Sequence, residues 1–137
     1  MKHKGNKFEH EHQRNYELMR AYRDALEKAH GHIRLDEVLA MTVDTPASRF
    51  WVSAERAMVV IARMYKGDTL GDMRPSKREM FKEIFNRVEE LRKQKPDTPL
   101  LHIVEIAVTQ PAPKFYLTPQ SAKVIICRIR RRKHTKK

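Results

Sequence analysis

The chain of 137 residues is poor in the residues that mark several protein classes. Cys127 is its single cysteine, so no disulfide can form within the chain, as is typical of a reducing compartment. Its four glycines form no phosphate-binding loop. No apolar run approaches membrane-spanning length, and the charged N-terminus lacks the apolar segment of a signal peptide. We therefore expect a cytoplasmic protein without membrane contact, with Cys127 as a small buried thiol.

Acidic residues are absent from one end of the chain. The net charge is +12, and the last ten residues hold seven Lys or Arg and no acid. Residues 1–14 contribute +2, which leaves only +3 for the remainder. A basic tail on a nearly neutral body is typical of proteins that bind a polyanion. A solubilising or disordered end is the alternative.

The strongest pattern in the chain is an internal repeat. Residues 35–64 align without a gap to residues 100–129, at a constant shift of 65 positions, with nine identical pairs. The match is densest where residues 46–53 read PASRFWVS and residues 111–118 read PAPKFYLT. Such self-similarity indicates a tandem duplication. Units of roughly 50 residues bury too little surface to be robust alone, so we expect the two repeats to share one core.

Apolar residues at helical spacing divide each repeat into three helices. We expect helices near 13–30, 35–43 and 54–65, and again near 76–91, 99–108 and 119–129, the last running on into the tail. The expected N-caps are Ser53, Ser76 (in a capping box with Glu79), Thr98 and Thr118. The predicted organisation is a flexible N-terminus (1–12), repeat 1 (13–65), a linker (66–75), repeat 2 (76–129) and a basic tail (130–137). The predicted fold class is all-α, with two tandem homologous helix-turn-helix-like repeats packed as one pseudo-symmetric domain.

An aromatic pair precedes the third helix of each repeat: Phe50-Trp51 and Phe115-Tyr116. Neighbouring residues of an extended segment point to opposite sides. We therefore expect Phe50 and Phe115 in the core, with Trp51 and Tyr116 half-exposed. Base stacking by these pairs is an alternative, but structural packing is the preferred interpretation.

Three helices in this order are typical of helix-turn-helix domains, whose third helix lies in the major groove. Here about nine residues (44–52) separate the last two helices of the first repeat, where three or four are usual. Gln pairs with adenine and Glu accepts from cytosine, whereas Arg and Lys contact phosphates. The candidate nucleic-acid-binding residues are Arg49, Glu55, Arg56, Lys114, Gln120, Ser121, Lys123, Arg128, Arg130, Arg131, Arg132 and Lys133.

No pattern in the sequence predicts catalysis or metal binding. His10 and His12, like His30 and His32, lack cysteine or acidic partners at a known metal spacing. No nucleophile–base signature is present. We therefore expect a protein that is not an enzyme, with no metal, no cofactor and no catalytic residues.

The P-A-x-[KR]-F-[WY]-x-[ST] signature, followed by a helix, resembles small basic proteins of unassigned function in bacterial genomes and their mobile elements. The resemblance covers most of residues 13–133 and implies no activity or site residues. The architecture resembles tandem helix-turn-helix DNA-binding proteins.

The sequence thus predicts a non-catalytic DNA-binding protein, regulatory in transcription or architectural, acting as a monomeric pseudo-dimer or a homodimer. RNA stays open as a ligand, because phosphate attraction does not distinguish the two nucleic acids. The apolar third helices (54–64 and 119–129) fit an alternative, a helical adaptor or assembly protein. It would bind a protein partner, and its tail would contact nucleic acid only nonspecifically.

Overall fold

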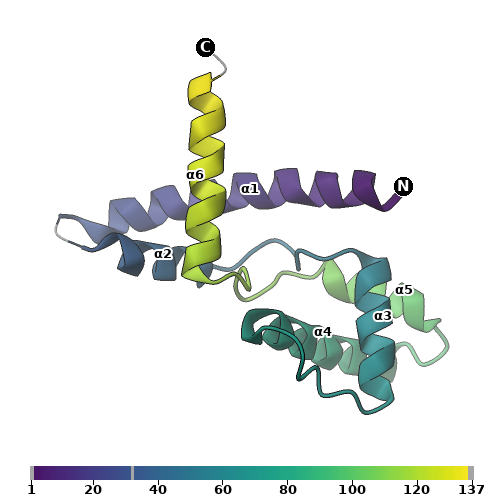
Figure 1. The fold of residues 1–137 in the computed structure, drawn as a ribbon. Helices are drawn as coiled ribbons and strands as arrows, with labels where there is room; N and C mark the ends of the chain where they lie inside the picture. The colour runs from purple at the N-terminus through teal and green to yellow at the C-terminus, as the bar shows by residue number, and fades with distance from the viewer. Residues whose placement is uncertain (1, 32, 136–137) are drawn as a thin grey trace.

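A computed structural model describes the backbone of residues 2–31 and 33–135, and the side chains of residues 10–31 and 33–132. Within these residues the chain is all-helical, as predicted, and forms six helices. In chain order they are α1 (Lys2–Ala29), α2 (Leu35–Val43), α3 (Ala54–Tyr65), α4 (Pro75–Gln94), α5 (Leu100–Val108) and α6 (Pro119–Thr135) (Figure 1). Extended pairing in these ranges is limited to one isolated bridge, between Ala47 and Ala112.

The third helices begin where the sequence predicts, because a hydroxyl side chain caps each one. Ser53 accepts a hydrogen bond from the backbone N–H of Arg56 at 3.1 Å. Thr118 accepts one from the backbone N–H of Ser121 at 3.1 Å. Each cap satisfies an N–H group that has no partner within its helix. The N-cap predictions for Ser53 and Thr118 are confirmed.

Two other predicted helix starts are wrong. Helix α4 begins at Pro75, and its N-cap, Arg74, makes no side-chain cap, so Ser76 lies inside the helix and forms no capping box. Proline at the first helical position is favourable because its N–H would be unpaired there anyway. Helix α5 begins at Leu100, since Pro99 has the extended ψ of 148° of a residue before a helix.

Helix α1 is much longer than the sequence suggests, and α6 runs on into the tail as predicted. Helix α1 begins at Lys2, well before the predicted start near Gln13, and it ends at Ala29. Gly31, with a φ of 93°, follows this end in the left-handed region that glycine tolerates. Helix α6 continues as far as Thr135. The backbone of residues 130–135 is therefore the last part of a helix.

Each third helix packs against the first two helices of the other repeat. Helix α3 contacts α4 and α5, whereas α6 contacts α1 and α2 (Figure 1). Neither α3 with α1 or α2, nor α6 with α4 or α5, forms a helix pair among the described residues. The connectors, residues 44–53 and 109–118, therefore cross between the two halves. This crossing explains why they are longer than a helix-turn-helix turn.

The two connectors hydrogen-bond to each other where they cross. Ala47 and Ala112 exchange backbone hydrogen bonds of 3.0 and 2.9 Å. The N–H of Phe50 donates to the carbonyl oxygen of Val108, and the N–H of Phe115 donates to that of Val43, each at 3.0 Å. Within each of these two pairs of hydrogen bonds, a shift of 65 residues relates the residues of one bond to those of the other.

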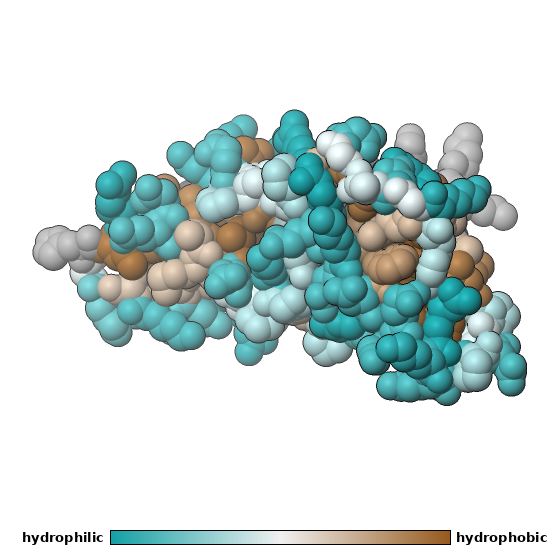
Figure 2. All heavy atoms as spheres, turned by 90° about the horizontal axis from the view of Figure 1, so that it is seen from below, coloured by the Kyte–Doolittle hydropathy of each residue, from teal (hydrophilic) through white to brown (hydrophobic). Residues whose placement is uncertain are grey.

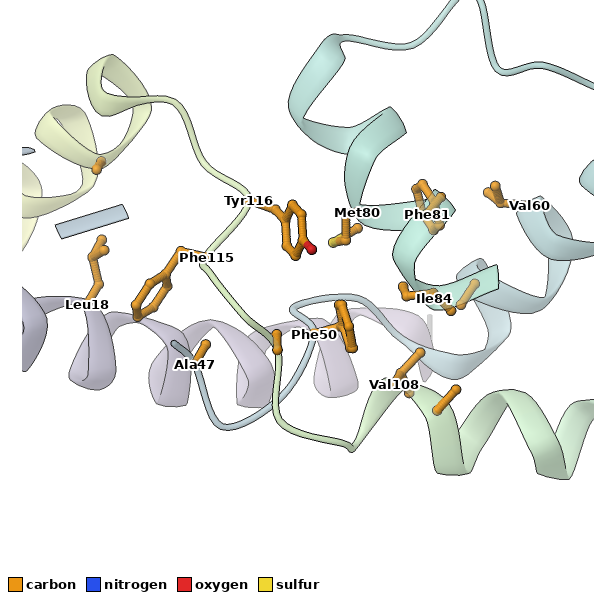
Figure 3. Close-up of a cluster of buried hydrophobic side chains, with 14 of the residues drawn as sticks. Leu18, Ala47, Phe50, Val60, Met80, Phe81, Ile84, Val108, Phe115 and Tyr116 are labelled. Atoms are coloured by element: carbon orange, nitrogen blue, oxygen red, sulfur yellow. The ribbon is translucent and has the colours of Figure 1, made fainter. Parts of the chain in front are cut away.

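The aromatic pairs fill the core on either side of this crossing. Phe50 is fully buried and stacks on Tyr116, with ring centroids 6.0 Å apart. Phe115 is 2% exposed and stacks on Trp51 at 6.3 Å. In Figure 3, Phe115 lies on the side of Leu18 and α1, and Phe50 on the side of α4. The core prediction for Phe50 and Phe115 is confirmed, and Trp51 is partly buried. Half-exposure of Tyr116 is wrong, because its ring is enclosed at the crossing and only 9% exposed.

The segment between the repeats is a packed element of the second half. Leu70 is fully buried, and its carbonyl oxygen accepts a hydrogen bond from the Arg78 side chain at 3.1 Å. Helix α3 ends shortly before Gly67, whose φ of 99° turns the chain back toward α4. The position 65 residues later is Arg132, and there α6 continues without a turn.

Candidate nucleic-acid interface

The two third helices lie on the same side of the molecule. In Figure 1, α6 crosses in front of α1, and α3 crosses in front of α5. The helices run in opposite directions, and α6 extends well beyond the helices that it crosses (Figure 1).

Helix α6 presents a polar and basic face to solvent. Ala122 and Ile126 point inward and are buried. The opposite stripe, at spacings of three and four residues, is exposed and consists of Gln120, Lys123, Val124, Cys127, Arg128 and Arg131. Side chains at these spacings share one helix face. The stripe therefore brings together four of the predicted nucleic-acid-binding residues.

The charge of α6 is entirely positive. The helix contains six Lys or Arg and no acidic residue. Arg130 and Arg132 flank the stripe and are exposed, whereas the side chain of Lys133 lies outside the described residues. In the described part of the chain, the side chains of Lys123, Arg128 and Arg130 form no ion pair or hydrogen bond. These three cations are available to an external anion.

Helix α3 presents a more neutral face at the equivalent positions. Glu55, Arg56 and Val59 are exposed. Arg63 forms ion pairs with Asp68 at 2.7 Å and Asp72 at 3.8 Å. The pKa of the Asp68 carboxyl is lowered, mainly because the Leu70 N–H donates a hydrogen bond to it and also because the Arg63 side chain donates another. The carboxylates of Asp68 and Asp72 thus neutralise the charge of Arg63, the second arginine of α3.

The predicted residues of the two connectors already have partners within the molecule. Arg49 donates to the carbonyl oxygens of Phe50 and Val52, each at 3.0 Å, and burial lowers the pKa of its guanidinium. Lys114 pairs with Glu79 at 3.2 Å and lies 5.6 Å from the centre of the Tyr116 ring. Arg49 thus binds its own connector and Lys114 pairs with α4, and their role at phosphates stays a prediction.

Ser121 belongs to the helix cap as well as to the predicted site. It is half-buried, and its hydroxyl accepts a hydrogen bond from the Thr118 hydroxyl at 3.0 Å. Among the predicted base-reading residues, Gln120 and Lys123 of α6, with Glu55 and Arg56 of α3, have exposed side chains.

Cys127 contradicts the expectation of a buried thiol, because it is exposed. It lies one turn after Lys123 on the outward stripe, while the neighbouring Ile126 fills the inward position. The apolar character of its neighbours in sequence hid this orientation.

Sequence reasoning also missed the exposed valines. Val59 of α3 is 53% exposed and Val124 of α6 is 41% exposed. They occupy equivalent positions, one turn after Glu55 and Gln120. Helical spacing from Glu55 and Gln120 was the signal that could have found them.

Features of other kinds of site are few in the described residues. No group of three His, Cys, Asp or Glu side chains comes together there, and His32 lies outside them. A hollow of about 390 Å³ lies where the end of α2 and the end of the second connector meet α4. The ion pair between Glu79 and Lys114 is part of its lining. No described helix has the length and apolarity needed to span a membrane.

Comparisons with protein-family models, with curated proteins and with solved structures found no match to this chain.

Proposed function

We propose that this protein is a non-catalytic DNA-binding protein of the cytoplasm, regulatory or architectural, built from two pseudo-symmetric repeats. The observation that carries the proposal is the outward face of α6, with its unpaired Lys123, Arg128 and Arg130 and no acidic residue in the helix. Such a helix is attracted to phosphates, and the major groove of B-form DNA is wide enough to admit it.

The pseudo-symmetry extends this proposal to α3. Both third helices lie on one side of the molecule, and the crossing contacts repeat at a 65-residue shift (Figure 1). A covalent pseudo-dimer of this kind offers two helices to one duplex, as dimers of helix-turn-helix proteins do. The two outward faces differ in charge and sequence, so the bound site need not be palindromic. Helix α6 supplies most of the attraction.

Fluorescence anisotropy with duplex DNA at 50 and 200 mM salt tests the proposal. The test variant replaces Lys123, Arg128 and Arg130 with Ala, and a control replaces the exposed α4 and post-α4 residues Lys82, Lys93 and Lys95. Both variants lose the same charge. The slope of log K against log salt is negative, and loss of three phosphate contacts should reduce its magnitude by about 2.7, at about 0.9 per contact. The control should keep the wild-type slope.

Two results would count against this proposal. Equal weakening by both triple variants would show that net charge, and not the α6 face, drives binding. No salt-dependent binding of the wild type to any duplex would favour the adaptor function instead.

The adaptor alternative has one observation of its own. Leu26 and Leu35 are 45% and 47% exposed where α1 meets α2, and hydrophobic atoms gather at that end in Figure 2. The first helices of the two repeats align at a shift of 62 positions, which pairs Leu26 with Val88, and Val88 is buried. In the second half the Leu70 segment folds back toward α4, whereas α6 runs straight on as far as Thr135.

A further inference from the structure

Two exposed valines stand out on the third helices. Val59 and Val124 are 53% and 41% exposed, while Val60, Ile61 and Ile126 of the same helices are almost fully buried and Ile125 and Ile129 are partly buried. Valine loses side-chain freedom in a helix and is a poorer helix former than alanine. An exposed valine therefore contributes little to folding at either position.

The surroundings of Val124 are those of a base-reading helix face. Gln120 lies one turn before Val124, and Lys123 lies beside it on the same exposed stripe. Residues four positions apart on a helix are about 6 Å apart, so their side chains can reach neighbouring base pairs. Gln can hydrogen-bond adenine through N6 and N7, and apolar side chains contact the thymine methyl group in the major groove.

We propose that Val124 contacts a thymine methyl group while Gln120 hydrogen-bonds an adenine in a neighbouring base pair of the same major groove. The ligand class is B-form DNA with A·T pairs at this site, and its phosphates complement the acid-free face of α6. This inference rests on the proposed DNA-binding function and adds to it the base type that is read. Val59, one turn after Glu55, is the equivalent methyl contact of α3.

Uracil provides a direct probe, because it differs from thymine only by the missing methyl group. Duplexes are first selected from a random pool with the full chain. The affinity for an enriched duplex is then compared with that for the same duplex carrying deoxyuridine in place of thymine. A buried methyl group contributes about 0.8 kcal/mol, so the wild type should lose roughly fourfold in affinity at the contacted thymine.

The variant Val124→Ala separates this contact from a general effect. It should bind the thymine duplex roughly fourfold more weakly than the wild type, and it should not distinguish thymine from uracil. Leu101→Ala, which truncates a side chain 45% exposed on α5, is the matched control and should keep the full preference for thymine. Circular dichroism checks that both variants stay folded.

Several outcomes would overturn the inference. A wild type that binds thymine and uracil duplexes equally, or a Val124→Ala variant that keeps the thymine preference, would show that no methyl group is read. Binding to all duplexes without enrichment would also overturn it, while leaving an architectural DNA-binding function standing. A preference for RNA would overturn it too, because RNA carries uracil and its major groove is too narrow for a helix. No binding to any duplex would instead sink the proposed function.

Discussion

Phe50 and Phe115 are the residues that tie each connector into the opposite half. Both are almost fully buried, and each has a ring from the other connector as its partner: Tyr116 for Phe50 and Trp51 for Phe115. Arg87 of α4 adds a cation–π contact at 5.4 Å to the Phe50 ring. The side chain that the repeat keeps identical is thus the one that fills the core.

We expect Phe50→Ala and Phe115→Ala each to lower the free energy of unfolding by about 3–5 kcal/mol, because each leaves a cavity in the shared core. Tyr16→Ala, which removes a side chain 68% exposed, should change it by no more than about 0.5 kcal/mol. Urea denaturation followed by circular dichroism measures all three. Near-wild-type stability of either Phe variant would show that this phenylalanine does not fill the shared core.

We expect Tyr116 to make stability depend on alkaline pH. Burial, with smaller contributions from Glu83 and Glu79, raises the pKa of its hydroxyl to about 12. In the unfolded chain this group loses its proton near pH 10. Between these values the unfolded state binds fewer protons than the folded state, so stability falls as pH rises from about 10 to 12.

We expect Tyr116→Phe to flatten this alkaline decline, since it removes the titrating hydroxyl. Tyr16→Phe, at an exposed position, should leave the decline unchanged. Urea midpoints measured at several pH values between 9 and 12 compare the variants. An identical pH dependence in Tyr116→Phe and the wild type would show that Tyr116 does not control it.

At the scale of elements, the main feature of the fold is that each third helix packs on the first two helices of the other repeat. The two repeats thus exchange their third helices. Ile61 of α3 and Ile126 of α6 are equivalent, and both are buried. Because of this exchange, the helix that carries Ile61 packs on α4 and α5, whereas the helix that carries Ile126 packs on α1 and α2. A small change at either position should therefore be felt in the distant repeat.

We expect Ile61→Val to speed amide hydrogen exchange mainly in α4 and α5, and Ile126→Val mainly in α1 and α2. Each substitution removes one methylene, at a cost of about 0.5–1.5 kcal/mol, so the fold should survive while local opening increases. Hydrogen-exchange mass spectrometry locates the change. Faster exchange of α1 and α2 in Ile61→Val would show that α3 packs on its own repeat.

At the scale of the whole molecule, neither repeat has a complete set of helices of its own. Val60 and Ile61 of α3 are fully buried only because α4 and α5 are present. The same holds for Ile126, which needs α1 and α2. Fragments this small bury a limited fraction of their surface even when their core is complete.

We expect fragments 1–74 and 75–137 to lack cooperative unfolding when studied separately as monomers, and to regain it when mixed. Each fragment supplies the third helix that the other needs. Thermal melts of the single and mixed fragments, with mass determination by light scattering, test this. Cooperative melting of either fragment as a monomer would show that a repeat does not need the third helix of the other.

The sequence alone determined the features that depend on local physics. Hydroxyl residues before the third helices predicted their starts at Ser53 and Thr118, because a cap needs only its own first turn. Apolar spacing predicted the helices, and the identical phenylalanines predicted the core. The local signals erred at Ser76 and Thr98, where the adjacent Pro75 and Pro99 set the boundaries instead.

Only the tertiary structure decided which helix packs on which. The helices of the two repeats have similar apolar faces, so local pattern cannot distinguish packing within a repeat from packing across repeats. The long connectors were the one sign of the crossing. The crossing also determines which side chains face solvent: it places Cys127 and Val124 outward and encloses Tyr116. Arg49 and Lys114 have partners within the molecule. Exposure is a property of the assembled core, since it depends on residues far away in the chain.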